Sequence, residues 1–193
     1  MDKGITGIIL AGGESRRFDG EKGLAILREK PLIEWVLEAI KPLCSEIIIS
    51  ANTESYQSYG HRIIPDIESG KGPMMGIYSA LLNSETEHNL VLSVDTPLVS
   101  ADLLQYIFQN KGNAQVAVPQ SGVNHFEPLI GYYSQNTLFL MEAFFKMNNY
   151  KLPDFFKTVS FKGIDLESWD EFQSQFLSNV NTREVLLALE GMR

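Results

Sequence analysis

Residues 10–22 combine two adjacent glycines with basic side chains. The segment starts at the end of an apolar run, contains Gly12 and Gly13, and continues to Arg17 and Lys22. Adjacent glycines let the backbone turn tightly and bring its N–H groups toward an anion, and arginine and lysine neutralise negative charge. The pattern therefore predicts a phosphate-binding loop. A plain surface turn is the alternative, but it would not require the basic residues.

A carboxylate follows a second apolar run, since Asp95 comes directly after residues 90–94. In an open α/β sheet, ligands bind at the carboxyl ends of the strands. Mg²⁺ bound to a nucleotide uses one or two protein carboxylates together with phosphate oxygens and water. Asp95 is thus a candidate Mg²⁺ ligand. The alternative is an aspartate that caps the turn before Pro97.

Three further segments carry polar residues at comparable places. Residues 65–76 form a second glycine-rich loop before a helical pattern, which can bind an anion or be an ordinary Gly-Pro turn. Asn52 closes another apolar run, and residues 179–182 (N-V-N-T) precede the last helical pattern. An asparagine or threonine in N-V-N-T can also cap that helix.

The elements that must position these loops are visible as alternating patterns. Continuous apolar runs predict strands at residues 6–11, 46–50, 62–65, 90–94, 115–118 and 128–133, with an edge strand at 159–162. Helical periodicity predicts helices near residues 31–43, 75–82, 100–108, 138–147 and 182–189. The alternation predicts an α/β fold, with residues 1–193 in a single three-layer α/β/α domain around a mostly parallel, Rossmann-like sheet.

Composition excludes several classes of protein. The 193 residues carry a net charge of −8, which argues against a generally basic nucleic-acid-binding surface. No stretch approaches the roughly 20 apolar residues of a membrane-spanning helix, so a cytoplasmic location is expected. The single cysteine, Cys44, cannot form an internal disulfide and is expected to have a structural role.

The spacing of residues 10–22 is neither that of a P-loop nor that of a G-x-G-x-x-G dinucleotide fold. It resembles the L-A-G-G-x-S-x-R-M-G-x-D-K signature of the nucleotidylyltransferases that include molybdenum cofactor guanylyltransferase. Phe18, Asp19 and Glu21 depart from that signature. Residues 65–76 resemble the P-D-x-x-x-G-x-G-P-x-x-G segment of the same family, and residues 179–182 resemble the N-V-N-T of its guanylyltransferases.

The resemblance implies a sheet of the nucleotide-diphospho-sugar transferase type and a set of site residues. Nucleotide binding is expected from Leu10, Ala11, Gly12, Gly13, Lys22, Asn52, Asp66 and Asp95. Acceptor binding is expected from Gly72, Gly76, Asn179 and Asn181. Catalysis is expected from Arg17, Lys22 and Asp95, with Asp95 as the Mg²⁺ ligand.

The implied reaction is transfer of GMP from GTP to the phosphate of molybdopterin or Mo-molybdopterin, with release of pyrophosphate. A protein that delivers the acceptor, or one that matures a molybdoenzyme, is an expected partner, and neither nucleic acid nor membrane is. The alternatives are a cytidylyltransferase, a sugar-1-phosphate nucleotidylyltransferase and a non-catalytic nucleotide-binding regulator. Near residues 148–151, where such guanylyltransferases often carry arginines, Lys151 offers the positive charge.

Overall fold

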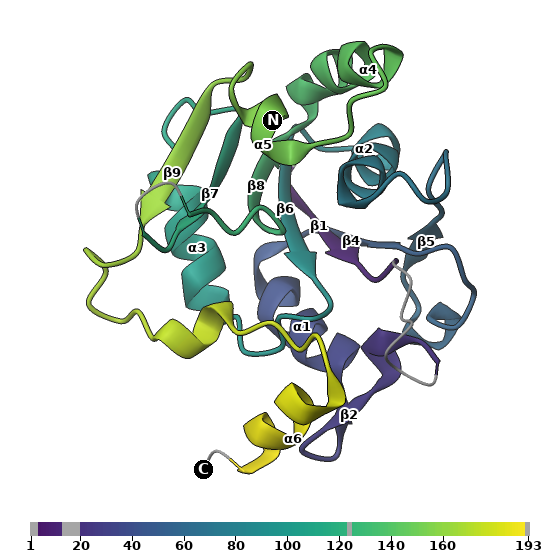
Figure 1. Ribbon diagram of the computed structural model, residues 1–193, viewed down its shortest axis with the longest axis vertical. Helices are drawn as coiled ribbons and strands as arrows, with labels where there is room; N and C mark the ends of the chain where they lie inside the picture. Colours follow the sequence, from purple (N-terminus) through teal and green to yellow (C-terminus); the bar gives the residue numbers. More distant parts are fainter. Residues whose placement is uncertain (1–3, 13–19, 123–124, 192–193) are drawn as a thin grey trace.

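A seven-stranded sheet forms the centre of the molecule (Figure 1). The structure is a computed structural model that describes residues 4–12, 20–122 and 125–191. The strands lie in the order β5-β4-β1-β6-β8-β7-β9. Their bounds are β1 (Ile5–Leu10), β4 (Glu46–Ser50), β5 (Arg62–Ile64), β6 (His88–Ser93), β7 (Val116–Gln120), β8 (Ile130–Ser134) and β9 (Phe161–Asp165).

The sheet is mostly parallel, as the alternating pattern predicted. Strands β5, β4, β1 and β6 pair in parallel, and β7 pairs in parallel with β9. Strand β8 runs antiparallel to both of its neighbours, β6 and β7. The central strands are largely apolar because both of their faces are covered: Ile8 and Ile9 are each fully buried although their side chains point to opposite faces.

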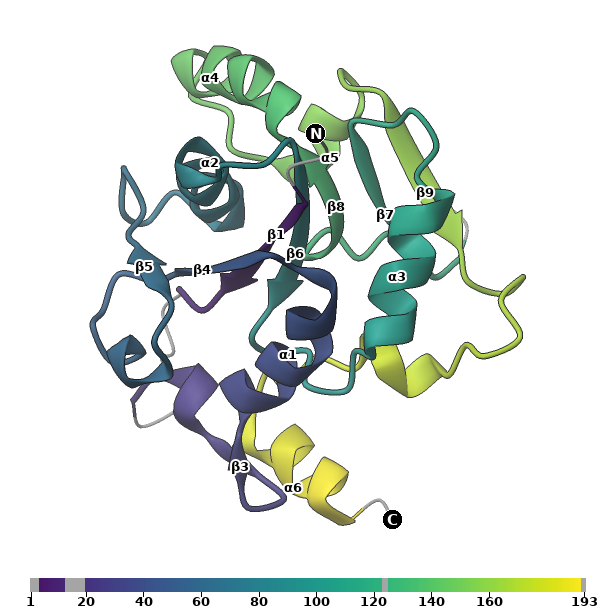
Figure 2. The same cartoon turned by 180° about the vertical axis from the view of Figure 1, so that it is seen from behind.

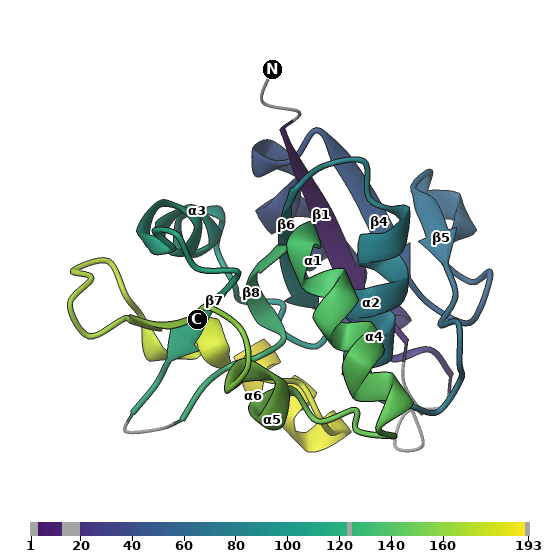
Figure 3. The same cartoon turned by 90° about the horizontal axis from the view of Figure 1, so that it is seen from above.

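Helices cover the two faces of the sheet (Figures 2 and 3). Helices α1 (Leu32–Ile40) and α3 (Ala101–Asn110) pack on one face, where Ile9 and Ile49 point. Helices α2 (Pro73–Asn83), α4 (Leu138–Lys146) and α5 (Leu152–Phe156) pack on the other. The expected three layers are therefore present. The five-residue α5 was not expected, because a helix of that length shows no periodicity.

Two local signals explain where helices begin and end. The hydroxyl of Ser100 accepts a hydrogen bond from the Leu103 amide at 3.1 Å, so Ser100 caps α3. The first helix is shorter than the expected residues 31–43, since α1 ends at Ile40 and continues as a 3₁₀ turn, Lys41–Leu43. Pro42 lies in that turn and has no N–H to continue the α-helical hydrogen bonds.

A small satellite layer lies beside the sheet. The hairpin of β2 (Ile26–Leu27) and β3 (Lys30–Pro31) packs next to α6 (Arg183–Gly191), at the bottom of Figure 1. The third apolar cluster, which holds these elements together, is formed by Leu27, Leu32, Val180 and Leu189.

The hairpin was not expected from the sequence. Its turn residues, Arg28 and Glu29, have φ angles of 48° and 66°, a region where glycine or asparagine is usual. The Arg28 guanidinium donates to the Leu189 carbonyl at 3.1 Å, which ties the hairpin to α6. Tertiary contacts with α6 thus favour a turn that local preference would not select.

Cys44 lies partly buried under β1, where a Cβ added to Gly7 would meet its sulfur at 3.1 Å. Burial raises the pKa of the Cys44 thiol to about 12, which fits a structural role. Among the helices that the structure describes, none is long and apolar enough to cross a membrane.

Candidate active site

A lysine and an aspartate meet at the carboxyl edge of the sheet. Lys22 opens the 3₁₀ turn Lys22–Leu24, beyond the loop after β1, and Asp95 lies two residues past β6. Strands β1 and β6 are parallel neighbours with Leu10 opposite Ser93, so the segments that follow them start at the same edge. The Lys22 Nζ lies 2.7 Å from the Asp95 Oδ2. The side chains are 19% and 18% exposed, so the ion pair is largely shielded from water.

Gly23 determines how closely Lys22 approaches β6. A Cβ at Gly23 would lie 2.7 Å from the hydroxyl oxygen of Tyr56 and 2.8 Å from a methyl group of Val94. Both distances are shorter than van der Waals contact, so only glycine fits there without a shift. Sequence reasoning did not single out Gly23, because the groups that crowd it come from distant parts of the chain.

The Asp95 carboxylate is not needed to close the turn in which it lies. Thr96 closes that turn, since its amide and its hydroxyl both donate to the Ser93 carbonyl, at 3.2 and 2.7 Å. The Asp95 Oδ1 is buried and accepts no hydrogen bond among the residues that the structure describes. A buried carboxylate oxygen without a partner is costly, and a cation would supply one.

The residues around Asp95 fit a divalent cation that is held jointly with substrate. In the described part of the chain, no three His, Cys, Asp or Glu side chains come together as a metal site. A hard divalent cation bound to a nucleotide needs few protein ligands, because phosphate oxygens and water complete its coordination. Asp95 can therefore hold such a cation once a polyphosphate is present.

The N-V-N-T segment reaches the same place from the other end of the chain. The Val180 amide donates to the Asp95 backbone carbonyl at 2.7 Å. The side-chain oxygen of Asn181 accepts a hydrogen bond from the Lys22 Nζ at 3.0 Å. Asn179 instead donates to the Leu177 carbonyl within its own segment, at 3.4 Å. Of the two asparagines, Asn181 is the one that joins the Lys22–Asp95 pair.

Asn52 and Asp66 form a second polar pair, at the ends of the neighbouring strands β4 and β5. The Asn52 amide donates to the Asp66 carboxylate at 3.1 Å, and its oxygen accepts from the Asp66 backbone N–H at 2.8 Å. These two hydrogen bonds fix the orientation of the Asn52 amide. The pair that the sequence predicted as nucleotide-binding is thus a single preformed unit.

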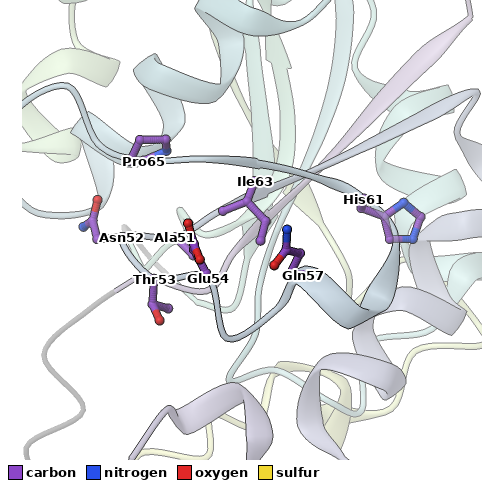
Figure 4. Close-up of a pocket in the computed structure, with 8 residues that line it drawn as sticks. All are labelled: Ala51, Asn52, Thr53, Glu54, Gln57, His61, Ile63 and Pro65. Carbon is purple, nitrogen blue, oxygen red and sulfur yellow. The ribbon is translucent and has the colours of Figure 1, made fainter.

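A hollow of about 490 Å³ adjoins Asn52 (Figure 4). It lies between the loop after β4 and strand β5, and its lining includes Glu54, Gln57 and His61. Burial lowers the pKa of His61 and the charge of Lys41 lowers it further, which favours a neutral imidazole. Neither Lys22 nor Asp95 lines this hollow, so it is separate from the Lys22–Asp95 pair.

The first residues of the β1 loop differ from the expectation that their amides face a ligand. The N–H groups of Ala11 and Gly12 both donate to the Ser50 carbonyl, at 2.9 Å each. The Leu10 side chain is buried in the core. Amide contacts from this loop to a phosphate must therefore come from beyond Gly12. Gly13 and Arg17, predicted to be nucleotide-binding and catalytic, lie outside the described residues.

The two glycines of the second loop have different structural roles. Gly72 precedes α2 with φ +81°, a conformation that other residues rarely adopt. A Cβ at Gly76 would lie 2.9 Å from the Ser50 hydroxyl and 3.3 Å from the Asp66 carboxylate. Gly76 therefore lets the first turn of α2 approach β4 and Asp66 closely, which is a packing requirement beside the nucleotide residues.

Glu127 is a carboxylate near the site to which sequence reasoning gave no chemistry. Its side chain is 20% exposed. Burial raises the pKa of Glu127, and the charge of Asp95 raises it further, against the opposing effect of His125. The pairing of β6 with β8 explains why Glu127 lies near Asp95. Leu92 lies opposite Ile130, and continuing that antiparallel register would set Asp95 opposite Glu127.

Lys71 is a second residue that sequence reasoning missed. Its Nζ lies 4.7 Å from the centre of the Tyr150 ring and 3.7 Å from the Glu68 carboxylate. The contact with Tyr150 brings the loop before α2 alongside the segment that carries Lys151. The loop before α2 and the segment around Tyr150 are far apart in the chain, and each contributes a lysine, Lys71 and Lys151, where the two segments meet.

The fold and the site together define the class of protein. A mostly parallel sheet carries at its carboxyl edge a lysine–aspartate pair, a preformed asparagine–aspartate pair and glycine-containing loops. This arrangement lies at the place where open α/β sheets bind nucleotides, and its residues fit a polyphosphate and a cation. Such a fold and site are typical of a nucleotidyltransferase.

Comparisons with known proteins identify the family. Residues 7–159 match the MobA-like NTP transferase domain, and the chain belongs to this family. It is 34% identical over 182 residues to the "probable molybdenum cofactor guanylyltransferase" of Flavobacterium johnsoniae, covering 94% of each chain. It is 33% identical to the protein of that name from Pelotomaculum thermopropionicum, covering 97% of this chain and 92% of that one.

The fold is similar to that of a solved member. The crystal structure of molybdopterin-guanine dinucleotide biosynthesis protein A from Archaeoglobus fulgidus superposes with a TM-score of 0.80. The two chains are 25% identical, and the match covers 96% of each. Because the match covers 96% of this chain, the structural similarity extends beyond residues 7–159.

Proposed function

We propose that this protein transfers GMP from GTP to the phosphate of molybdopterin or Mo-molybdopterin and releases pyrophosphate. Its curated relatives are named for this activity and match nearly the whole chain. The observation that carries the proposal is the Lys22–Asp95 pair, 2.7 Å apart and largely buried at the edge where a nucleotide would bind. Lys22 can contribute positive charge to a triphosphate, and Asp95 can hold the cation of that triphosphate.

The reaction needs no general base. A phosphomonoester has a second pKa near 6, so at pH 7 the acceptor phosphate is largely a dianion. One of its oxygens attacks the α-phosphorus of GTP, and the bond from that phosphorus to the bridging oxygen breaks. Pyrophosphate leaves with the bonding electrons. Catalysis therefore consists of bringing two anions together in line and neutralising their charge.

Different residues would neutralise the charge of the triphosphate and position the nucleotide. Asp95 would hold Mg²⁺ together with phosphate oxygens, and the ion supplies charge neutralisation at the triphosphate. Lys22 and Arg17 add positive charge to the same group. Gly13 would contribute a backbone contact, and the preformed Asn52–Asp66 pair would contact the nucleoside.

The acceptor would lie on the side of Gly72 and Gly76, toward the N-V-N-T segment. Lys71 and Lys151 are suited to the negative charge of the acceptor. They would take the place of the arginines that related guanylyltransferases often carry near residues 148–151. We propose further that residues 1–193 act as one domain, that the reaction takes place in the cytoplasm and that a partner protein delivers the acceptor.

A nucleotide panel tests this function. Purified protein is incubated with Mg²⁺, molybdopterin and GTP, CTP, UTP or ATP, and both pyrophosphate and the dinucleotide product are measured. GTP should be the preferred donor. Preference for CTP or UTP would assign the protein to a cytidylyltransferase or sugar-1-phosphate nucleotidylyltransferase activity. Tight GTP binding without product from any phosphorylated acceptor would indicate a regulator.

A further inference from the structure

The C-terminal segment holds one amide side chain in a fixed position beside the Lys22–Asp95 pair. Val180 is fully buried in the satellite cluster with Leu27, Leu32 and Leu189. Its backbone N–H also donates to the Asp95 carbonyl at 2.7 Å. The next residue, Asn181, is therefore anchored both to the satellite layer and to the segment that follows β6.

Among the residues that the structure describes, the Lys22 ammonium donates to two acceptors of different charge. One is the Asp95 carboxylate at 2.7 Å, and the other is the Asn181 amide oxygen at 3.0 Å. A lysine ammonium has three N–H donors, so both hydrogen bonds can exist together. The carboxylate is anionic, whereas the amide is neutral.

This difference matters once a cation binds. When Asp95 ligates a divalent cation, its attraction for Lys22 falls, and the cation repels the ammonium. The neutral Asn181 oxygen keeps its capacity to accept. We infer that Asn181 is a positioning residue for Lys22, which holds the ammonium in the site while Asp95 serves the cation. This inference rests on the proposed function, in which Asp95 binds the cation and Lys22 binds the triphosphate.

The inference differs from the expectation that Asn181 binds the acceptor. A residue that acts through Lys22 affects nucleotide binding in the absence of any acceptor, and only while Lys22 is present. A residue that binds the acceptor directly has no effect on nucleotide affinity. The two roles can therefore be separated without measuring turnover.

A double-mutant cycle on GTP affinity tests the inference. The Kd for GTP is measured by equilibrium titration with Mg²⁺ and no acceptor, for the wild-type protein, Asn181→Ala, Lys22→Ala and the double variant. Asn181→Ala should raise the Kd about tenfold in the wild-type background, as expected for a hydrogen bond to a charged group. In the Lys22→Ala background the change should be less than about twofold.

A neighbouring variant controls for general loosening of the segment. The Thr182 hydroxyl accepts from the Val185 amide at 3.4 Å at the start of α6, whereas the described contact between this segment and the Lys22 ammonium is made by Asn181. Thr182→Ala should lower Tm while leaving the Kd for GTP within about twofold of wild type. An equal rise in Kd for Thr182→Ala and Asn181→Ala would overturn the inference.

The outcomes also separate this inference from the proposed function. Wild-type protein that binds GTP, with no change of Kd in Asn181→Ala, contradicts the positioning role and leaves the function standing. Independent effects of the two substitutions, which multiply in the double variant, contradict it as well. Wild-type protein that fails to bind GTP with Mg²⁺ would contradict the function and the inference together.

Discussion

The Lys22 ammonium and the Asp95 carboxylate lie 2.7 Å apart although 73 positions separate them in the chain. They meet because β1 and β6 are adjacent and parallel, so the segments that follow them share one edge of the sheet. Both side chains are more than four-fifths buried, and removing one takes a close partner of opposite charge from the other. Each substitution must therefore be assessed for stability as well as for activity.

Asp95→Asn should abolish most of the turnover. The amide is isosteric with the carboxylate but is a poor ligand for a divalent cation, so we expect a loss of about 100-fold or more in pyrophosphate release, the scale of one preorganised electrostatic contact. Asp102→Asn is the matched control, because Asp102 is exposed in the first turn of α3. Near wild-type turnover in Asp95→Asn would show that this carboxylate is not the metal ligand.

Lys22→Ala should lower kcat/KM for GTP by about 100-fold, equivalent to a few kcal/mol of transition-state stabilisation. Lys157→Ala provides the comparison, because Lys157 is 75% exposed and pairs with Asp154 on the surface. Steady-state kinetics of pyrophosphate release measures the effect. Equal losses of kcat/KM in the two variants would mean that the charge of Lys22 contributes no more to the reaction than a surface charge does.

Gly23→Ala should lower both stability and activity. The new methyl group would lie 2.7 Å from the Tyr56 hydroxyl and 2.8 Å from Val94, so the turn that carries Lys22 must shift. Overpacking of this kind costs about 1–3 kcal/mol, which thermal unfolding can measure.

Tyr56→Phe in the same chain should restore part of that loss, because it removes the hydroxyl oxygen that makes the closest contact. Gly191→Ala is the control, since a Cβ at Gly191 meets nothing within 4 Å. An unaltered Tm and rate in Gly23→Ala would contradict the close approach.

Cys44 should react slowly with thiol reagents in the folded protein. Its pKa of about 12 leaves little thiolate at pH 8, so alkylation should be much faster after unfolding. The free energy of unfolding should also fall as pH rises from 9 to about 12, because the unfolded thiol ionises first and favours the unfolded state. Cys44→Ala should show a smaller fall over that range. Identical pH dependence in the two proteins would contradict the raised pKa.

Lys71→Ala should raise KM for the acceptor while leaving the Kd for GTP nearly unchanged. We expect a change of about three- to tenfold, since loss of one exposed charge contact is worth roughly 1 kcal/mol. Lys146→Ala, at the exposed end of α4, is the matched control. A rise in the Kd for GTP instead would place Lys71 on the nucleotide side.

The main sheet could be predicted because its signals are local. Continuous apolar runs correspond to the central strands, and the helix predicted near residues 100–108 corresponds to α3. The β2–β3 hairpin could not be predicted, since Arg28 and Glu29 adopt positive φ only because α6 packs beside them. Helix α5 was too short for its periodicity to be detected.

In the candidate site, too, some features could be predicted from the sequence and others could not. Residue type and position at a strand end were enough to select Asp95, whereas Asn52 and Asp66 were expected from the resemblance to the nucleotidylyltransferase family. The sequence did not indicate that the amides of Ala11 and Gly12 would be taken by the Ser50 carbonyl. It also gave no chemistry to Glu127, whose neighbour Asp95 is reached only through the pairing of β6 with β8.

The sequence by itself determined the class of fold, the family and which loops carry polar groups, because these depend on apolar runs, residue types and short spacings. Only the tertiary structure decided which of those groups touch. Lys22 reaches Asp95 across 73 positions and Asn181 across 159. Contacts at such separations depend on strand order and on how the satellite layer packs, and neither is encoded in the neighbours of any one residue.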